Sequence, residues 1–159
     1  MTLNTDGLTM LHLGLGSFHR AHQAIYLQNL IDSGETHWSL AGGNLRPDMA
    51  ETIAALQQQD GQYTLETVTP AGERRYQRIS SIRRVISYEP SLAGLITLGA
   101  AADTRIISFT VTEAGYYLDA KNRLDLNFAD LASDVEWARR AEPGQTIYGA
   151  LVAILRARM

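Results

Sequence analysis

The sequence contains no cysteine, and this absence removes several kinds of chemistry. Disulfide bonds, thiolate catalysis and cysteine-based zinc sites are all excluded. Long apolar runs are missing too, because no segment approaches the roughly 20 residues that a membrane-spanning helix needs. The first seven residues have neither a basic start nor an apolar core, so they do not resemble a secretory signal. These absences predict a cytoplasmic protein with no membrane partner.

Basic residues are in the minority. The 14 lysines and arginines stand against 17 aspartates and glutamates, which leaves a net charge of −3. Surfaces that bind nucleic acid are usually basic, so no nucleic-acid partner is expected. The 159 residues, 45% of them hydrophobic, suffice for one globular domain with its own core. We therefore expect a single domain over residues 1–159.

Segments of strand length alternate with segments of helical periodicity along the chain. Strands are expected at 10–15, 38–42, 81–87 and 104–111, and helices at 19–33, 47–59, 90–99, 128–140 and 146–158. This alternation predicts an α/β fold, a Rossmann-like doubly wound and mainly parallel sheet. Residues 62–79 break the alternation and predict a β-hairpin insertion at an edge of the sheet. The strand at 104–111 is the most apolar, as expected for a strand buried on both faces.

A glycine-rich turn follows the first expected strand. Gly14 and Gly16 lack a Cβ, so the backbone can turn sharply there and lie close against a ligand. The helix expected next offers free N–H groups and a partial positive charge at its first turn. This arrangement suits a pyrophosphate, as in dinucleotide-binding βαβ units. The pattern G-x-G-x-x-G would need a third glycine where the chain has His19, so the two glycines alone fit a turn that serves only packing equally well.

The whole segment 14–23, Gly-Leu-Gly-Ser-Phe-His-Arg-Ala-His-Gln, resembles the signature of the mannitol dehydrogenase family of long-chain polyol dehydrogenases. In that family the third glycine is replaced, and a Phe-His-x-x-His run opens the helix. Residues 38–46 resemble the family's second strand and the loop after it, and residues 110–117 resemble its motif after a central strand. The members that most resemble this chain are those that act on D-arabinitol, with further agreement at 65–68, 72–74, 79–82 and 146–149.

The resemblance implies reversible hydride transfer between a polyol and NAD, with D-arabinitol oxidised to D-xylulose. A mannitol 2-dehydrogenase and a fructuronate or tagaturonate (hexuronate) reductase stay open as alternatives, as does a non-catalytic nucleotide-binding fragment. The resemblance also implies a further helical domain that carries a catalytic lysine, asparagine and histidine. We therefore expect this chain to be the cofactor-binding domain without catalytic residues of its own. The face that such a domain would cover is a candidate for self-association.

The resemblance places the cofactor pyrophosphate on the backbone amides of the turn, which comprises Gly14, Leu15, Gly16, Ser17 and Phe18. Phe18 fits a core position beneath the turn as an alternative. His19 and His22 are spaced so that they could face one way on the first helical turn. Two histidines do not make a zinc site, so no metal is expected. His19 is instead expected to shape the cofactor loop.

The adenosine ribose of a nicotinamide cofactor usually meets an acid about 20 residues after the glycine turn. Asp48 is the nearest acid, and its carboxylate would select NAD by repelling a 2′-phosphate. Arg46 could stack on adenine or bind that phosphate, so mixed cofactor use stays open, and Asn44 lies in the same loop. Asp48 fits an acid in the first turn of a helix equally well, since Pro47 suits such a turn.

Thr110, Thr112 and Glu113 follow the most apolar strand. Ligands of open α/β sheets bind beyond the carboxyl ends of the strands, so both threonines are expected beside the cofactor. The resemblance implies an auxiliary role for Glu113 in proton passage, with an ordinary loop carboxylate as the alternative. Tyr117 and Lys121 match the Y-x-x-x-K pair of short-chain dehydrogenases, but the residues between them predict a turn rather than the helix that this pair requires.

Overall fold

The computed structural model of the protein describes residues 7–140 and 142–159. Its main sheet has four parallel strands in the order β5-β2-β1-β6. These strands are β1 (Leu8–Leu13), β2 (Trp38–Gly43), β5 (Ile82–Ile86) and β6 (Thr104–Phe109). With the hairpin strands set aside, this is the 3-2-1-4 order of a doubly wound sheet. The expected α/β fold is confirmed.

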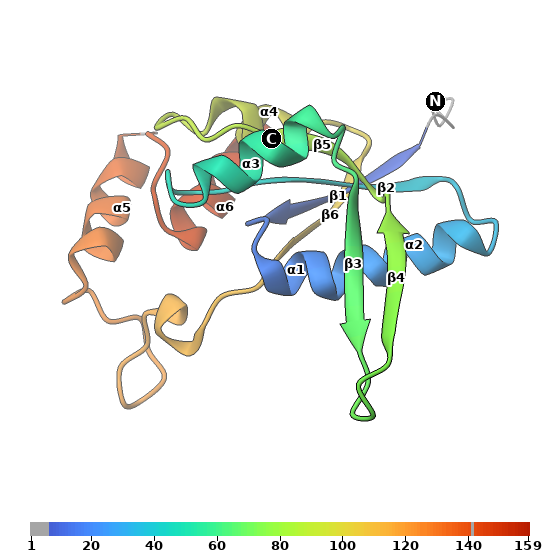
Figure 1. Ribbon diagram of the computed structural model, residues 1–159. Coiled ribbons are helices and arrows are strands. Elements are labelled where there is room, and N and C mark those ends of the chain that lie inside the picture. The colour runs from blue at the N-terminus through green and yellow to red at the C-terminus, as the bar shows by residue number, and fades with distance from the viewer. Residues whose placement is uncertain (1–6, 141) are drawn as a thin grey trace.

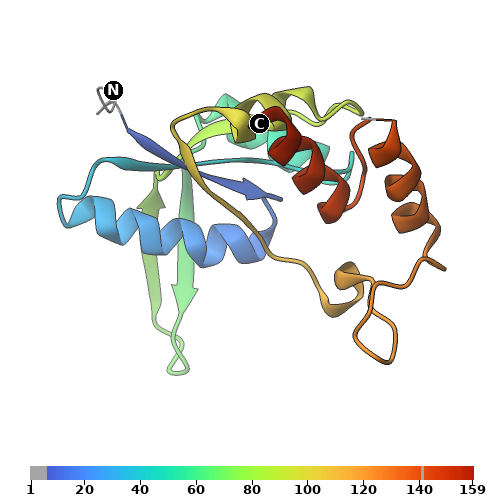
Figure 2. The ribbon, with the colours of Figure 1, turned by 180° about the vertical axis from the view of Figure 1, so that it is seen from behind.

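Helices cover both faces of the sheet, as Figures 1 and 2 show. They are α1 (Ser17–Ala21), α2 (Gln23–Asp32), α3 (Ala50–Gln58), α4 (Ala93–Ala100), α5 (Ala129–Arg139) and α6 (Ile147–Ala157), with a 3₁₀ turn, η1 (Glu113–Tyr116). Helices α1 and α2 lie on one face, and α4 and α6 lie on the other. No helix in the described ranges has the length and apolar character to cross a bilayer.

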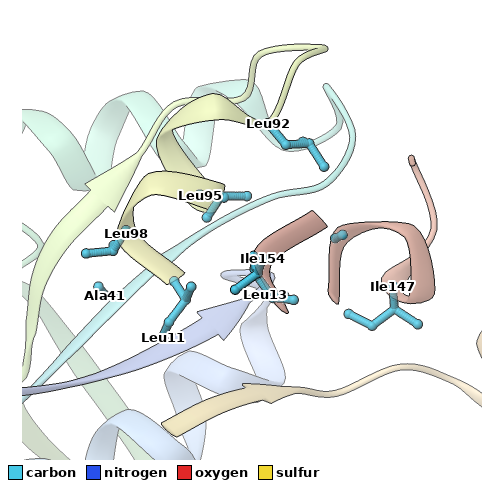
Figure 3. Close-up of a cluster of buried hydrophobic side chains, with 9 residues drawn as sticks. Leu11, Leu13, Ala41, Leu92, Leu95, Leu98, Ile147 and Ile154 are labelled. Carbon is cyan, nitrogen blue, oxygen red and sulfur yellow. The ribbon is translucent and has the colours of Figure 1, made fainter. Parts of the chain in front are cut away.

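Two apolar clusters fill the two faces. Successive side chains of a strand point to opposite faces, so Ala41 joins one cluster and Leu40 the other. The first cluster sets β1 against α4 and α6 and includes Leu11, Leu13, Leu95, Leu98 and Ile154 (Figure 3). The second sets β2 and β5 against α2 and α3 and includes Leu27, Ile53, Leu56 and Ile82. Full burial of each such side chain contributes about 1.5–3 kcal/mol to the free energy of folding, so both clusters stabilise the packing of the helices on the sheet.

The inserted hairpin does not extend the main sheet. Strands β3 (Tyr63–Val68) and β4 (Arg74–Ile79) pair only with each other and form a second, antiparallel sheet. The predicted β-hairpin insertion is confirmed, but its strands do not pair with the edge strand of the main sheet. At its base, Ile79 is fully buried in the second cluster, while most side chains further along are exposed. The hairpin is therefore anchored at one end and projects as an arm (Figure 1).

The expectation that β6 is buried on both faces is wrong, since Ile106 in its middle is 40% exposed. Strand β6 also lies at an edge of the sheet, where it pairs with β1. The helix expected over 19–33 is divided at His22, whose backbone is not helical, into α1 and α2. The helix expected over 47–59 begins only at Ala50, after Met49 adopts a left-handed conformation. Hydrophobic periodicity predicts where these elements lie in the sequence, but it predicts neither which strands pair nor where a helix begins and ends.

Candidate functional site

A cavity of about 620 Å³ opens at the carboxyl ends of β1, β2 and β6. Its walls come from the glycine turn, the loop after β2, the segment after β6 and the starts of α5 and α6. Figure 2 shows α5 beyond the strand ends, whereas α6 runs back over one face of the sheet. Most residues expected to bind a cofactor line the cavity, namely Gly14, Gly16, Asn44, Arg46, Asp48, Thr110 and Thr112. Residues predicted from separate segments of the sequence therefore meet at one cavity.

The glycine turn offers open space and free donors. Gly14 has a φ of +115°, which a larger residue adopts only with strain, and Gly16 caps α1. A Cβ at either glycine would meet no atom within 4 Å. The amides of Gly16, Ser17 and Phe18 donate to no other residue in the described ranges. The turn therefore fits an anion that approaches the backbone closely, such as a phosphate.

Asn44 holds the glycine turn to the loop after β2. Its buried side chain accepts a hydrogen bond from the Leu15 amide at 2.9 Å and donates one to the Asp48 carbonyl oxygen at 3.1 Å. The Leu15 amide is therefore already paired, and its side chain is fully buried. Leu15 and Asn44, both expected to contact a cofactor, are thus joined by a hydrogen bond that holds the turn in place.

A stacked pair of histidines lies beneath the turn. The rings of His12 and His19 are parallel to within 16°, with centroids 4.0 Å apart, and each side chain is 1% exposed. His19 Nδ1 donates to the Gln23 amide oxygen at 2.9 Å, since that oxygen can only accept. The ring nitrogens of His12 meet Ser108 Oγ at 2.9 Å and Thr110 Oγ1 at 3.3 Å. His19 thus shapes the loop from below and does not reach the cavity.

Both histidines are neutral at pH 7. Burial and, to a smaller extent, the nearby His19 lower the pKa of His12 to about 3. Burial also lowers the pKa of His19 to about 4, although the Gln23 hydrogen bond acts in the opposite direction. The pair therefore adds no positive charge to the turn.

The free energy of unfolding is expected to fall as pH drops from about 6.5 toward 4. In this range the histidines of the unfolded chain take up protons, while the buried pair does not. The unfolded state therefore binds more protons and is stabilised relative to the folded state as pH falls. The slope approaches about 1.4 kcal/mol per pH unit for each histidine. Urea unfolding at pH 7 and 5.5 measures it, and His12→Gln should reduce the difference. An equal difference in both proteins would contradict this account.

Arg46 spans the cavity rather than pointing at the turn. Its Nη2 donates to Asp130 Oδ2 at 3.2 Å and to the Tyr117 hydroxyl at 3.3 Å. Tyr117 donates to the same carboxylate oxygen at 2.6 Å and packs edge-on against Phe128. This hydrogen bond lowers the pKa of Asp130, while burial raises that of Tyr117. The three polar groups form one cluster at the cavity wall, which we call the Arg46 cluster.

Tyr117 and Lys121 lie in a turn, as expected. Tyr117 has a φ of +51°, and the Lys121 amide donates to Asp119 Oδ1 at 2.8 Å. No helix places the tyrosine and the lysine on one face. The arrangement does not fit the short-chain dehydrogenase pair.

Several other expectations need correction. Asp48 lies at the cavity wall before α3 begins, and the acid in the first turn of that helix is Glu51, so the reading of Asp48 as a first-turn acid is wrong. Phe18 is 63% exposed with its ring 4.4 Å from that of His22, so its reading as a core residue is wrong. Glu113 is exposed at the start of η1, beside cavity residues but not among them.

Sequence reasoning missed Asp134, which fixes the start of α6 at the cavity. Its buried carboxylate accepts hydrogen bonds from the Gln145 amide at 2.7 Å and the Thr146 amide at 2.8 Å, and also from the Thr146 hydroxyl. A Cβ at Gly149 would lie 2.3 Å from this carboxylate, so the glycine permits the contact. An aspartate in a helical segment gives no local sign of this role.

The parallel sheet, the glycine turn after β1 and the cavity at the strand ends define a nucleotide-binding domain of the Rossmann type. Within residues 7–140 and 142–159, no group of three or more histidines or acids is arranged to hold a metal ion. Residues 8–159 match the Rossmann domain of mannitol dehydrogenase, and the chain belongs to the mannitol dehydrogenase family.

Relatives of known name agree with this membership. The chain is 54% identical over 152 residues to a D-arabinitol 4-dehydrogenase of Ralstonia nicotianae. The matched region covers 94% of this chain and 31% of the relative. It is 48% identical over 151 residues to the enzyme of that name from Klebsiella pneumoniae, covering 95% and 32%. The chain thus spans about a third of the length of these relatives.

A solved structure in the family has the same fold. It is the Pseudomonas fluorescens mannitol 2-dehydrogenase in a ternary complex with NAD and D-mannitol. The TM-score is 0.85 at 31% sequence identity, over 99% of this chain and 32% of that one. A D-sorbitol dehydrogenase in substrate-free form gives a TM-score of 0.80 at 26% identity.

Proposed function

We propose that this chain is the cofactor-binding domain of an NAD-dependent polyol dehydrogenase. The observation that carries the proposal is the turn at Gly14 and Gly16, whose free amides and open space face the cavity at the strand ends. The relative that was solved with NAD and D-mannitol shares this fold. NAD, when bound, supplies the hydride acceptor, and the chain supplies binding and orientation.

Each wall of the cavity has its own part in this proposal. The amides of Gly16, Ser17 and Phe18 donate to the pyrophosphate, and the missing Cβ of Gly16 leaves room for it. Asp48, in the loop after β2, accepts hydrogen bonds from the adenosine ribose. Thr110, which His12 also contacts, faces the nicotinamide side beyond β6.

D-arabinitol is the substrate that we propose for the whole protein, with D-xylulose as product. The two D-arabinitol 4-dehydrogenases are 54% and 48% identical to this chain, against 41% for a mannitol 2-dehydrogenase of Cereibacter sphaeroides. The only lysine of the chain, Lys121, lies in an exposed turn outside the cavity wall. A lysine base for alcohol oxidation is therefore not part of the cavity.

The purified 159-residue chain is expected to bind NADH without oxidising D-arabinitol, because it offers the nucleotide site and no lysine base beside it. NADH fluorescence titration and a turnover assay with D-arabinitol and NAD measure the two properties. Substantial turnover that disappears in Tyr117→Phe or Lys121→Ala would overturn the proposal in favour of short-chain dehydrogenase chemistry.

Asp48→Ala is expected to raise NADPH affinity relative to NADH by about ten-fold, since it removes a carboxylate that would repel the 2′-phosphate and bind the ribose. A charge-assisted contact of about 1.5–3 kcal/mol sets this scale. Glu51→Ala, an exposed acid in the first turn of α3, is the matched control and should leave the ratio unchanged. An unchanged ratio in Asp48→Ala would exclude Asp48 as the discriminating residue.

A further inference from the structure

The charge of the cavity wall raises a question of cofactor choice. Among the described residues that line the cavity, Arg46 is the only cation, and Asp48 and Asp130 are the acids. A free guanidinium at this place would bind a phosphate by paired hydrogen bonds and favour a 2′-phosphorylated dinucleotide. The direction in which Arg46 points therefore matters as much as its presence.

Arg46 is directed to the opposite wall. Its Nη2 lies 3.2 Å from Asp130 Oδ2, although the two residues are 84 positions apart in the sequence. Their side chains are 59% and 40% exposed, so the ion pair contributes little to stability. Its effect is instead electrostatic, because it places the only positive charge among the described lining residues beside a carboxylate.

Tyr117 fixes the other partner of this pair. Its hydroxyl donates to Asp130 Oδ2 at 2.6 Å, and its ring is almost fully buried against Phe128. Asp130 Oδ1 also accepts the Leu131 amide at 3.1 Å in the first turn of α5. Both carboxylate oxygens thus accept hydrogen bonds from groups other than Arg46. These bonds orient the Asp130 carboxylate for its ion pair with the Arg46 guanidinium.

We propose that Asp130 is a specificity-determining residue that makes the cavity reject 2′-phosphorylated dinucleotides. It holds the Arg46 guanidinium across the cavity and leaves the wall with one more negative than positive charge. This inference rests on the proposed function, since it concerns which dinucleotide the site accepts. A 2′-phosphate, with a charge of about −1.5 to −2 at pH 7, meets both the excess acid and an arginine that is already paired.

Asp130→Asn tests the proposal, because it removes the charge and keeps the size of the side chain. Dissociation constants for NADH and NADPH are measured by fluorescence titration on the whole chain, with circular dichroism to verify folding. The affinity for NADPH relative to NADH is expected to rise about ten-fold, the change that about 1.4 kcal/mol produces. Glu136→Gln, a matched exposed acid on the same helix outside the cavity, should leave the ratio unchanged.

Two further variants separate the roles. Arg46→Ala alone should not raise the affinity for NADPH relative to NADH, because it leaves Asp48 and Asp130 without a compensating cation. Adding Arg46→Ala to Asp130→Asn should remove the gain in NADPH affinity. A gain that persists in the double variant, or a rise in relative NADPH affinity in Arg46→Ala alone, would overturn the proposal.

The proposal can fail separately from the proposed function. If the unaltered chain binds NADH and Asp130→Asn leaves the ratio unchanged, Asp130 does not set specificity while the nucleotide site stands. If the unaltered chain binds neither NADH nor NADPH, the proposed function itself fails and this inference falls with it.

Discussion

Gly16→Val is expected to lower the affinity for NADH by about 100-fold or more while the domain stays folded. The added side chain would occupy the open space at the turn and hold the pyrophosphate away from the amides of Ser17 and Phe18. Two charge-assisted hydrogen bonds at about 1.5–3 kcal/mol each set the size of the loss. Folding is spared because no atom lies within 4 Å of the new Cβ position and the φ of Gly16 is an ordinary −65°.

Gly99→Val is expected to have the opposite effects, a loss of stability without a loss of NADH affinity. A Cβ at Gly99 would lie 2.7 Å from Ile154 in the first apolar cluster, far along the chain from the glycine turn. This variant should lose stability through overpacking and keep its NADH affinity in the folded fraction. NADH titration and urea unfolding of both variants make the comparison. Unchanged NADH affinity in folded Gly16→Val would mean that the glycine turn serves packing alone.

Asp134→Ala is expected to lower the free energy of unfolding by about 3 kcal/mol. The substitution leaves the amides of Gln145 and Thr146 and the Thr146 hydroxyl without their acceptor, and each buried unpaired group costs about 1–3 kcal/mol. Thr146 caps α6, and that helix carries Ile147 and Ile154 into the core. The local loss therefore spreads to the packing of one whole face of the sheet.

Urea unfolding of Asp134→Ala measures this loss. Glu136→Ala, on the same helix but exposed and paired only with Arg139, is the control and should stay within about 0.5 kcal/mol of the unaltered protein. A loss below about 1 kcal/mol in Asp134→Ala would mean that other groups or water replace the carboxylate.

Local patterns allowed much of the fold to be predicted. The alternation of strands and helices and the turn at Gly14 are visible in the sequence because periodicity and backbone conformation depend on neighbouring residues. Strand order depends on distant packing, so no local pattern indicates that β6 lies at an edge or that β3 and β4 pair apart from the main sheet. The residues at the strand ends were predicted because parallel strands bring their carboxyl ends to one side.

The contacts inside the site could not be predicted in the same way. Arg46 meets Asp130 across 84 positions, and His12 meets Thr110 across 98. No spacing rule links such pairs. One signal was available for His12, which lies between Leu11 and Leu13 in a mainly apolar strand. A histidine that is buried there must find polar partners.

Two-dimensional ¹H–¹⁵N NMR of the chain titrated with NAD tests the central claim most directly. If the glycine turn binds the pyrophosphate, the largest shifts should occur at the amides of Gly16, Ser17 and Phe18, with further shifts at Asp48 and Thr112. Residues 63–79 of the hairpin, outside the cavity wall, should not shift. Absent shifts at Gly16, Ser17 and Phe18 with NAD at saturating concentration, or the largest shifts in the hairpin, would contradict the account.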